Sequence, residues 1–393
     1  MKTASAHRNW GIDSLRGLSI LLVLLNHLGL GFRLPLKKSL LIEVLPKRLL
    51  DAVCFNGYEA VFIFFVISGF LITSRVLQQS GTLHSIDWRG FYRRRAARIV
   101  PLLLALLAVL AVLHVLGFAD YRISAPGQSL GGALWSAIAL HLNWYEGQTT
   151  WLPASWDVLW SLSIEEVFYL AFPLLCLWVP RRALVLLLAL LALSLPVSRG
   201  ALAGNEIWQE KAYLPGMAAI ATGVLCALAA QAWPRLPAWA SRALLLLGGA
   251  GLGLVLFNWG FKLLGQGSML LLTGSSAALV LACHQLCRAA QAPRGLQWLA
   301  AMGRLSYEIY LSHMFVVLSA VAIYRGLFAP DMRWDFLVYP IAIGLAVKLG
   351  AYLQRWVSQP CEQALRGRAP ANPGSREYAP ARADRSAGSS AGR

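Results

Sequence analysis

The sequence predicts an all-α polytopic membrane protein with about ten transmembrane helices and a re-entrant segment near residues 130–145. Of its 393 residues, 58% are hydrophobic and 13% are charged, whereas about a quarter of the residues in a soluble domain are charged. Long apolar runs, such as 102–116, 183–195 and 244–257, recur along the chain. Arginine and lysine gather in short clusters between these runs, as they do in loops that flank membrane spans.

The apolar runs place the individual spans. A helix needs about 20 apolar residues to cross the hydrocarbon core of a bilayer. The first run is too long for a signal-peptide core and lacks a small-residue cleavage site, so we expect it to stay attached as the first span. The ten predicted spans are 12–32, 58–78, 98–118, 158–179, 182–199, 212–231, 241–259, 267–287, 301–324 and 335–357.

Residues 130–145 are also apolar, but this segment is short and contains Gly131, Gly132, His141 and Asn143. Polar and irregular backbone is tolerated at membrane depth where protein or water surrounds it. We therefore predict a re-entrant or interfacial element here and not a full crossing.

The distribution of basic residues predicts the orientation of the chain. With a cytoplasmic N-terminus and ten spans, Arg181, Arg182 and most other basic clusters fall on the cytoplasmic side, whereas an eleventh crossing would place them outside. The basic loop 33–57 is the exception. The membrane domain is expected to cover 1–360. Residues 361–393, rich in Ala, Gly, Ser, Pro and Arg, are expected to form a disordered basic cytoplasmic tail.

The formal net charge of +17 is explained by contact with anionic lipid headgroups and by topology, because no basic domain gathers it as nucleic-acid binding would require. The six cysteines are scattered, most of them in apolar segments, and fit small core residues. Cys283, His284 and Cys287 could form one corner of a metal site, but no fourth ligand lies near them in the sequence, so no metal site is predicted.

Arg16 and His27 are ionisable residues within the first predicted span, eleven positions apart. At about 100° per residue they lie on nearly the same helix face, about 16 Å apart along the axis. Ionisable groups in a membrane are costly unless they are paired or hydrated, so each is a functional candidate. The alternative is an arginine that anchors the topology and a histidine at the interface.

The fourth predicted span carries two consecutive carboxylates, Glu165 and Glu166, in an otherwise apolar helix. Tyr169 is one turn from Glu165 and shares its face. Such a pair favours a functional or paired role over an interfacial position. Glu165 lies about 10 Å from the outer end of its span, the depth expected for His27, so we expect these two side chains to be able to meet.

Further polar residues share helix faces. In the ninth span, Ser306, Tyr310 and His313 fall on one face at intervals of four and three. A polar network between helices explains them as well as substrate contact does. Ser68 and Gly69 in the second span equally fit close helix packing.

Four arginines lie within six residues at the start of the third span, in FYRRRAARIVP. A topology anchor accounts for them. Guanidinium groups also bind phosphate in a bidentate manner, so the same cluster suits a ligand that carries several phosphates. The four residues are Arg93, Arg94, Arg95 and Arg98.

Five motifs in a fixed order resemble acyltransferase family 3, the integral-membrane O-acyltransferases that modify bacterial surface polysaccharides and related acceptors. The resemblance covers about residues 10–357 and does not extend to the periplasmic SGNH-type domain that some members carry. Each motif is weak alone, and their shared order makes them specific. The motifs are LRGLSILLVLLNH, FFVISGFLIT, FYRRRAARIVPLL, WSLSIEEVFYLAFPLL and GRLSYEIYLSH.

The resemblance implies an O-acyltransferase of the bacterial inner membrane that has no permanently bound cofactor and uses acyl-CoA, usually acetyl-CoA, as co-substrate. It also implies that the residues matching Arg16 and His27 are essential. The expected partners are membrane lipid and an acceptor hydroxyl on an envelope glycan, an exported glycan or a lipid-linked sugar.

This reading predicts a donor channel. The CoA phosphates would contact the four arginines, the pantetheine arm would pass Arg16, and the thioester would reach His27. His27 would act as general base, oriented by Glu165, with an acyl-histidine intermediate as the competing route. Two other functions stay open: a transporter or flippase for a lipid-linked sugar or small anion, and an acyltransferase that acts on a small lipophilic metabolite.

Overall fold

The computed structural model describes residues 9–32, 39–287, 291–328 and 331–366. Within these ranges the regular structure is helical and contains no strand. Nine helices in the described ranges are long and apolar enough to cross a membrane. The predicted class, an all-α polytopic membrane protein, is confirmed.

Nine of the ten predicted spans correspond to long helices. Shorter helices connect them or lie at their ends. The long helices are α1 (Trp10–Gly31), α4 (Gly57–Ser80), α5 (Trp88–Val115), α9 (Trp160–Trp178), α13 (Tyr213–Ala232), α14 (Ala238–Leu256), α16 (Ser268–Leu286), α18 (Ser306–Phe328) and α19 (Val338–Leu353). The connecting helices include α2 (Leu41–Val44), α3 (Lys47–Cys54), α8 (Ala154–Asp157), α12 (Glu206–Lys211), α15 (Trp259–Leu264) and α17 (Gln297–Arg304).

The structure differs from the prediction at residues 182–199, which form two helices and not one long span. Helix α10 (Arg181–Leu193) has 13 residues, about 20 Å of helix, which is shorter than the roughly 30 Å hydrocarbon core. Helix α11 (Leu195–Gly200) follows, with Pro196 in its first turn. Proline has no amide hydrogen to donate to the backbone of α10, so Pro196 explains why the helix is interrupted between α10 and α11.

The segment near 130–145 forms two short helices, α6 (Leu130–Ile138) and α7 (Leu142–Gln148). As expected, it is not a single spanning helix. Between them Leu140 has a φ of 61°, a left-handed conformation that is rare for residues other than glycine. Its carbonyl oxygen accepts a hydrogen bond of 2.6 Å from the Tyr213 hydroxyl, which fixes this turn against the start of α13.

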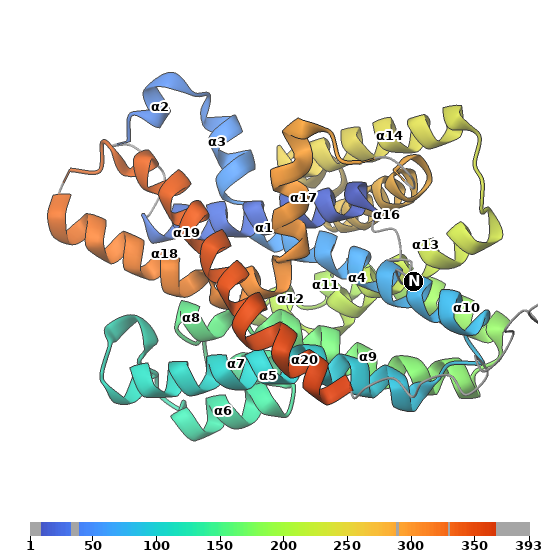
Figure 1. Ribbon diagram of the computed structural model, residues 1–393. Helices are drawn as coiled ribbons and strands as arrows, with labels where there is room; N and C mark the ends of the chain where they lie inside the picture. Colours follow the sequence, from blue (N-terminus) through green and yellow to red (C-terminus); the bar gives the residue numbers. More distant parts are fainter. Residues whose placement is uncertain (1–8, 33–38, 288–290, 329–330, 367–393) are drawn as a thin grey trace, which may run out of the picture.

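Helices α1 and α4 run through the middle of the molecule, with α5 and α9 on one side and α14 and α16 on the other (Figure 1). Helix α1 packs against α4, α17 and α18, while α4 also packs against α13 and α16. The residues predicted to carry the chemistry therefore lie on helices that share contacts at the centre of the bundle.

Small residues set the distance between these central helices. A Cβ atom on Gly69 would lie 2.1 Å from the carbonyl oxygen of Ile220 on α13. One on Gly17, next to Arg16, would lie 1.9 Å from the carbonyl oxygen of Leu299 on α17. Backbones that approach so closely need glycine at the crossing. The predicted packing role of Gly69 is confirmed.

Gly69→Ala is expected to destabilise the protein by about 1–3 kcal/mol, because the added methyl group overlaps backbone that cannot rotate away. The matched control is Gly249→Ala on α14, where a Cβ atom meets nothing within 4 Å. Thermal unfolding in detergent should show a lower midpoint for Gly69→Ala alone. Equal midpoints for the two variants would contradict the close crossing.

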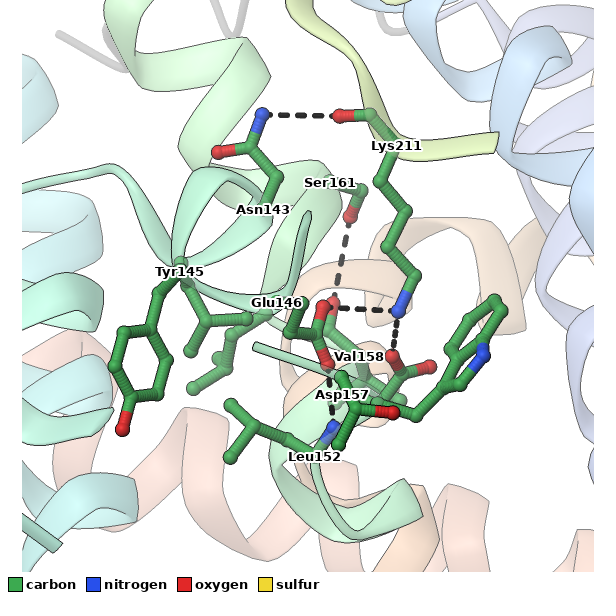
Figure 2. Close-up of polar contacts among 12 residues, drawn as sticks. Asn143, Tyr145, Glu146, Leu152, Asp157, Val158, Ser161 and Lys211 are labelled. Carbon is green, nitrogen blue, oxygen red and sulfur yellow. Dashed lines mark hydrogen bonds and ion pairs between the residues drawn. The ribbon is translucent and has the colours of Figure 1, made fainter. Parts of the chain in front are cut away.

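A buried ion cluster joins α7, α8 and α12 (Figure 2). The Lys211 ammonium group donates to Glu146 at 2.8 Å and to Asp157, and it lies 3.9 Å from the centre of the Trp151 ring. Glu146 also accepts from the amide of Leu152 at 3.0 Å. Lys211 is 1% and Glu146 0% exposed. These bonds hold α7 and α12 against α8, the short helix that directly precedes α9.

Lys211→Met should cost about 3–5 kcal/mol of stability, because it leaves the buried carboxylate of Glu146 and the half-buried carboxylate of Asp157 without their cation. Adding Glu146→Gln to this variant should recover part of the lost stability, since it removes one of the two carboxylates left without a cation. Thermal unfolding in detergent measures both. If Lys211→Met has the same unfolding midpoint as the wild-type protein, the cluster contributes nothing to stability.

The chain remains helical beyond residue 361, where the tail was expected to begin. Helix α20 (Gln359–Arg366) continues from α19 through the π-helical turn Gln354–Ser358 and packs against α5. Pro360 lies in the first turn of α20, where a missing amide hydrogen is tolerated. Regular helical structure therefore continues to Arg366, six residues past the predicted boundary. Residues 367–393, which make up the rest of the predicted tail, lie outside the described residues.

Candidate active site

A cavity of about 1110 Å³ lies among α1, α4, α5, α9 and α18. It brings together most of the residues singled out in the sequence, although they come from five helices spread over the chain. Of these residues, Arg16, Ser68, Arg94, Arg95, Arg98, Glu165, Glu166, Ser306 and Tyr310 line the cavity. Arg93, Tyr169, His27 and His313 are not among the lining residues.

Arg16 lies where α1 meets α18. Its guanidinium group donates to the Ser306 hydroxyl at 2.8 Å and lies 3.9 Å from the Asp13 carboxylate one turn earlier. The glycine next to it lets α17 approach α1 closely, so the backbone that carries Arg16 is fixed. The structure thus places an arginine with partial charge compensation at the cavity wall.

Glu165 is the centre of a polar network between α4, α5 and α9. Ser68 and Tyr169 both hydrogen-bond to its carboxylate. Arg95 lies 3.7 Å from Glu165 and 3.5 Å from Glu166. Its guanidinium carbon is 3.6 Å from the centre of the Tyr169 ring. Two anions and an aromatic face thus surround this arginine, which offsets the cost of burying it.

The predicted arginine cluster divides into residues with different surroundings. Arg95 is engaged by Glu165 and Glu166, as described. Arg94 lies 3.7 Å from Asp87 and donates to Gln79 at 3.2 Å, so it stands at the rim of the cavity. Arg98 lines the cavity farther along α5, whereas Arg93 lies on α5 outside the lining.

Two basic residues that we did not predict as site residues also line the cavity, Arg75 on α4 and His284 on α16. Arg75 follows Ser68 by seven positions, about two helical turns, and therefore shares its face. That spacing was a signal available in the sequence. His284 carried no comparable signal, because only the packing of α16 brings it to the cavity.

His27 lies against a second histidine. It is half-buried, and its ring centre is 5.0 Å from that of His313 on α18. His313 is fully buried, and its Nδ1 atom lies 2.7 Å from the carbonyl oxygen of Tyr310. The Tyr310 ring, 5.9 Å from the His313 ring, lines the cavity. Tyr310 therefore links the cavity to the histidine pair.

The hydroxyl group of Tyr310 ties this region to the start of α9. It donates to the carbonyl oxygen of Val158 at 3.0 Å and lies 2.7 Å from the Ser161 hydroxyl. Val158 directly follows Asp157 of the buried ion cluster, and Figure 2 shows Val158 and Ser161 next to that cluster. The Lys211 cluster thus supports the position of Tyr310, and through it the histidine pair.

The structure does not show the contact expected between Glu165 and His27. Glu165 contacts Ser68, Tyr169 and Arg95, while the ring partner of His27 is His313. Glu165 lines the cavity and His27 does not, so the equal depth expected from the sequence did not bring the two side chains together.

The family described as "Acyltransferase domain" matches residues 9–354. The chain belongs to acyltransferase family 3. This match covers all the helices that line the cavity and carry the histidine pair. The resemblance carried by the five motifs is therefore confirmed.

Curated relatives of this family share part of the chain. The peptidoglycan O-acetyltransferase OatA of Listeria monocytogenes is 26% identical over 213 residues, which are 52% of this chain and 29% of that protein. A Staphylococcus aureus protein named "Putative O-acetyltransferase" is 30% identical over 169 residues, 42% of this chain and 24% of that protein. The matches thus span 24% and 29% of the length of these two relatives. No solved structure matches the chain.

Proposed function

We propose that this family member is a membrane O-acyltransferase that transfers an acyl group, in the first place acetyl, from cytoplasmic acyl-CoA to a hydroxyl group of an envelope or exported glycan. The proposal rests on the cavity, which has arginines at its rim and Tyr310, beside the histidine pair, in its wall. The relative named as a peptidoglycan O-acetyltransferase supports a sugar hydroxyl as acceptor.

The donor phosphates are assigned to three arginines that line the cavity and for which no ion pair with Glu165 or Glu166 is found within 4 Å among the described residues. They are Arg98 and Arg94 on α5 and Arg75 on α4. Guanidinium groups bind phosphate through paired hydrogen bonds. Arg95 is held by Glu165 and Glu166 and would keep these carboxylates in place, while Arg93 would contribute only long-range attraction. This end of the bundle would face the cytoplasm of the bacterial inner membrane, where basic residues accumulate.

The acyl group would travel along α1. Arg16 and His27 are eleven residues apart on this helix, about 16 Å along its axis, a span that suits an extended pantetheine arm. His27 would take the proton from the acceptor hydroxyl as its oxygen attacks the thioester carbonyl. The C–S bond then breaks, and the CoA thiolate receives the proton.

His27→Ala and Arg16→Ala should each lower acetylation of the envelope glycan at least 100-fold, because the first removes the general base and the second the guide for the donor. The measurement is mass spectrometry of glycans from a strain that carries only the variant protein, with expression checked by immunoblot. Undiminished acetyl ester with either variant would overturn the mechanism. Purified protein that moves a lipid-linked sugar without consuming acetyl-CoA would support a flippase instead.

Arg98→Ala should raise the KM for acetyl-CoA about 10- to 100-fold, the effect of losing one charge-assisted hydrogen bond of about 1.5–3 kcal/mol. Arg93→Ala is the matched control, because it removes the same charge from the same helix outside the cavity lining, and should change KM less than about threefold. Membrane vesicles with radiolabelled acetyl-CoA supply the assay. Equal effects of both changes would mean that net charge, and not the cavity, determines donor binding.

A further inference from the structure

One ring nitrogen of His313 is buried without a hydrogen-bond partner. The side chain is 0% exposed, and Nδ1 lies 2.7 Å from the carbonyl oxygen of Tyr310. A carbonyl oxygen only accepts, so Nδ1 carries the hydrogen and Nε2 of the neutral ring carries a lone pair. Within the described residues, Nε2 has no hydrogen-bond partner. Leaving such an acceptor unsatisfied costs about 1–3 kcal/mol.

The neighbour positioned to use this lone pair is His27. The two ring centres are 5.0 Å apart and the ring planes are tilted by 47°, so the rings are in contact. Rotation of the half-buried His27 ring within this contact would bring its N–H group towards Nε2 of His313. The other titratable side chain that contacts His313 within the described residues is Tyr310, whose hydroxyl is already bonded to Val158 and Ser161.

We propose that His313 is a positioning residue whose Nε2 atom accepts a hydrogen bond from His27 and so fixes the tautomer of His27. One nitrogen of His27 then carries the hydrogen that faces His313, and the other presents its lone pair to the reacting groups. The inference rests on the proposed function, in which His27 is the general base. It gives His313 the orienting role that the sequence suggested for Glu165.

A neutral acceptor suits this task at membrane depth. When His27 takes the hydroxyl proton and becomes a cation, the hydrogen bond to His313 Nε2 stabilises it. The proton then passes to the CoA thiolate, and His27 returns to the neutral form. His313 keeps its own Nδ1 hydrogen on the Tyr310 carbonyl throughout, so the site needs no buried anion beside His27. A buried carboxylate there would need its own compensation in every state in which His27 is neutral.

Replacing His313 with glutamine or asparagine, which both carry a neutral amide, distinguishes this role from simple packing. The side-chain amide of Gln reaches the position of Nε2, whereas that of Asn reaches only the position of Nδ1. We expect His313→Gln to retain turnover within about 10-fold of wild type, and His313→Asn and His313→Ala to lose about 100-fold or more. The KM for acetyl-CoA should stay within about twofold in all three, because His313 does not line the cavity. The assay is transfer from radiolabelled acetyl-CoA to glycan in membrane vesicles.

A second measurement follows the tautomer without relying on activity. In protein labelled with ¹⁵N-histidine, the His27 signals, assigned by their loss in His27→Gln, should show one tautomer in wild type and in His313→Gln, and a mixture in His313→Asn.

The proposal is overturned if His313→Asn stays active while His313→Gln does not, because Nδ1 would then be the important atom. It is also overturned if all three variants are equally active or equally inactive, or if the His27 tautomer is the same in every variant. Wild-type vesicles that transfer no acetyl group would instead refute the proposed function, and the tautomer measurement would still decide the role of His313.

Discussion

The cost of placing charge inside a bundle of apolar helices governs how this molecule is organised. Arg95 has two carboxylates and an aromatic ring around it, and Lys211 has two carboxylates and an aromatic ring as well. An unpaired charge in such surroundings would cost several times the energy of an ordinary contact. Each cation therefore joins helices of the bundle: Arg95 joins α5 to α9, and Lys211 joins α12 to α7 and α8.

The two clusters resemble each other in composition but differ in access. Lys211 is 1% exposed and its cluster pins the connections at the start of α9, which is a structural role. The Arg95 cluster lines the large cavity, where Arg16, Arg94 and Arg98 add positive charge. Under the proposed function the cavity has to accept an anionic donor, and these arginines would supply the positive charge that attracts it.

The sequence was sufficient to predict most of the helices and the residues that share a helix face. It did not predict which helix faces pack against each other. The spans followed from apolar length, and the break in 182–199 had a signal in Pro196. Contacts such as Arg16 with Ser306, 290 residues apart, or Lys211 with Glu146, 65 residues apart, depend on which helices are neighbours, and helical periodicity carries no information about that. The expected pairing of Glu165 with His27 failed for this reason, since two groups at equal depth can face different neighbours.

Tyr310 connects the cavity, the histidine pair and the Lys211 cluster. It lines the cavity, its ring lies beside His313, and its hydroxyl is held by the segment that the Lys211 cluster fixes. Under the proposed function, this ring would lie beside the path of the thioester from the cavity to His27. The Lys211 cluster would then serve the chemistry indirectly, because it fixes Asp157, and the carbonyl oxygen of the next residue, Val158, accepts the hydrogen bond that holds Tyr310.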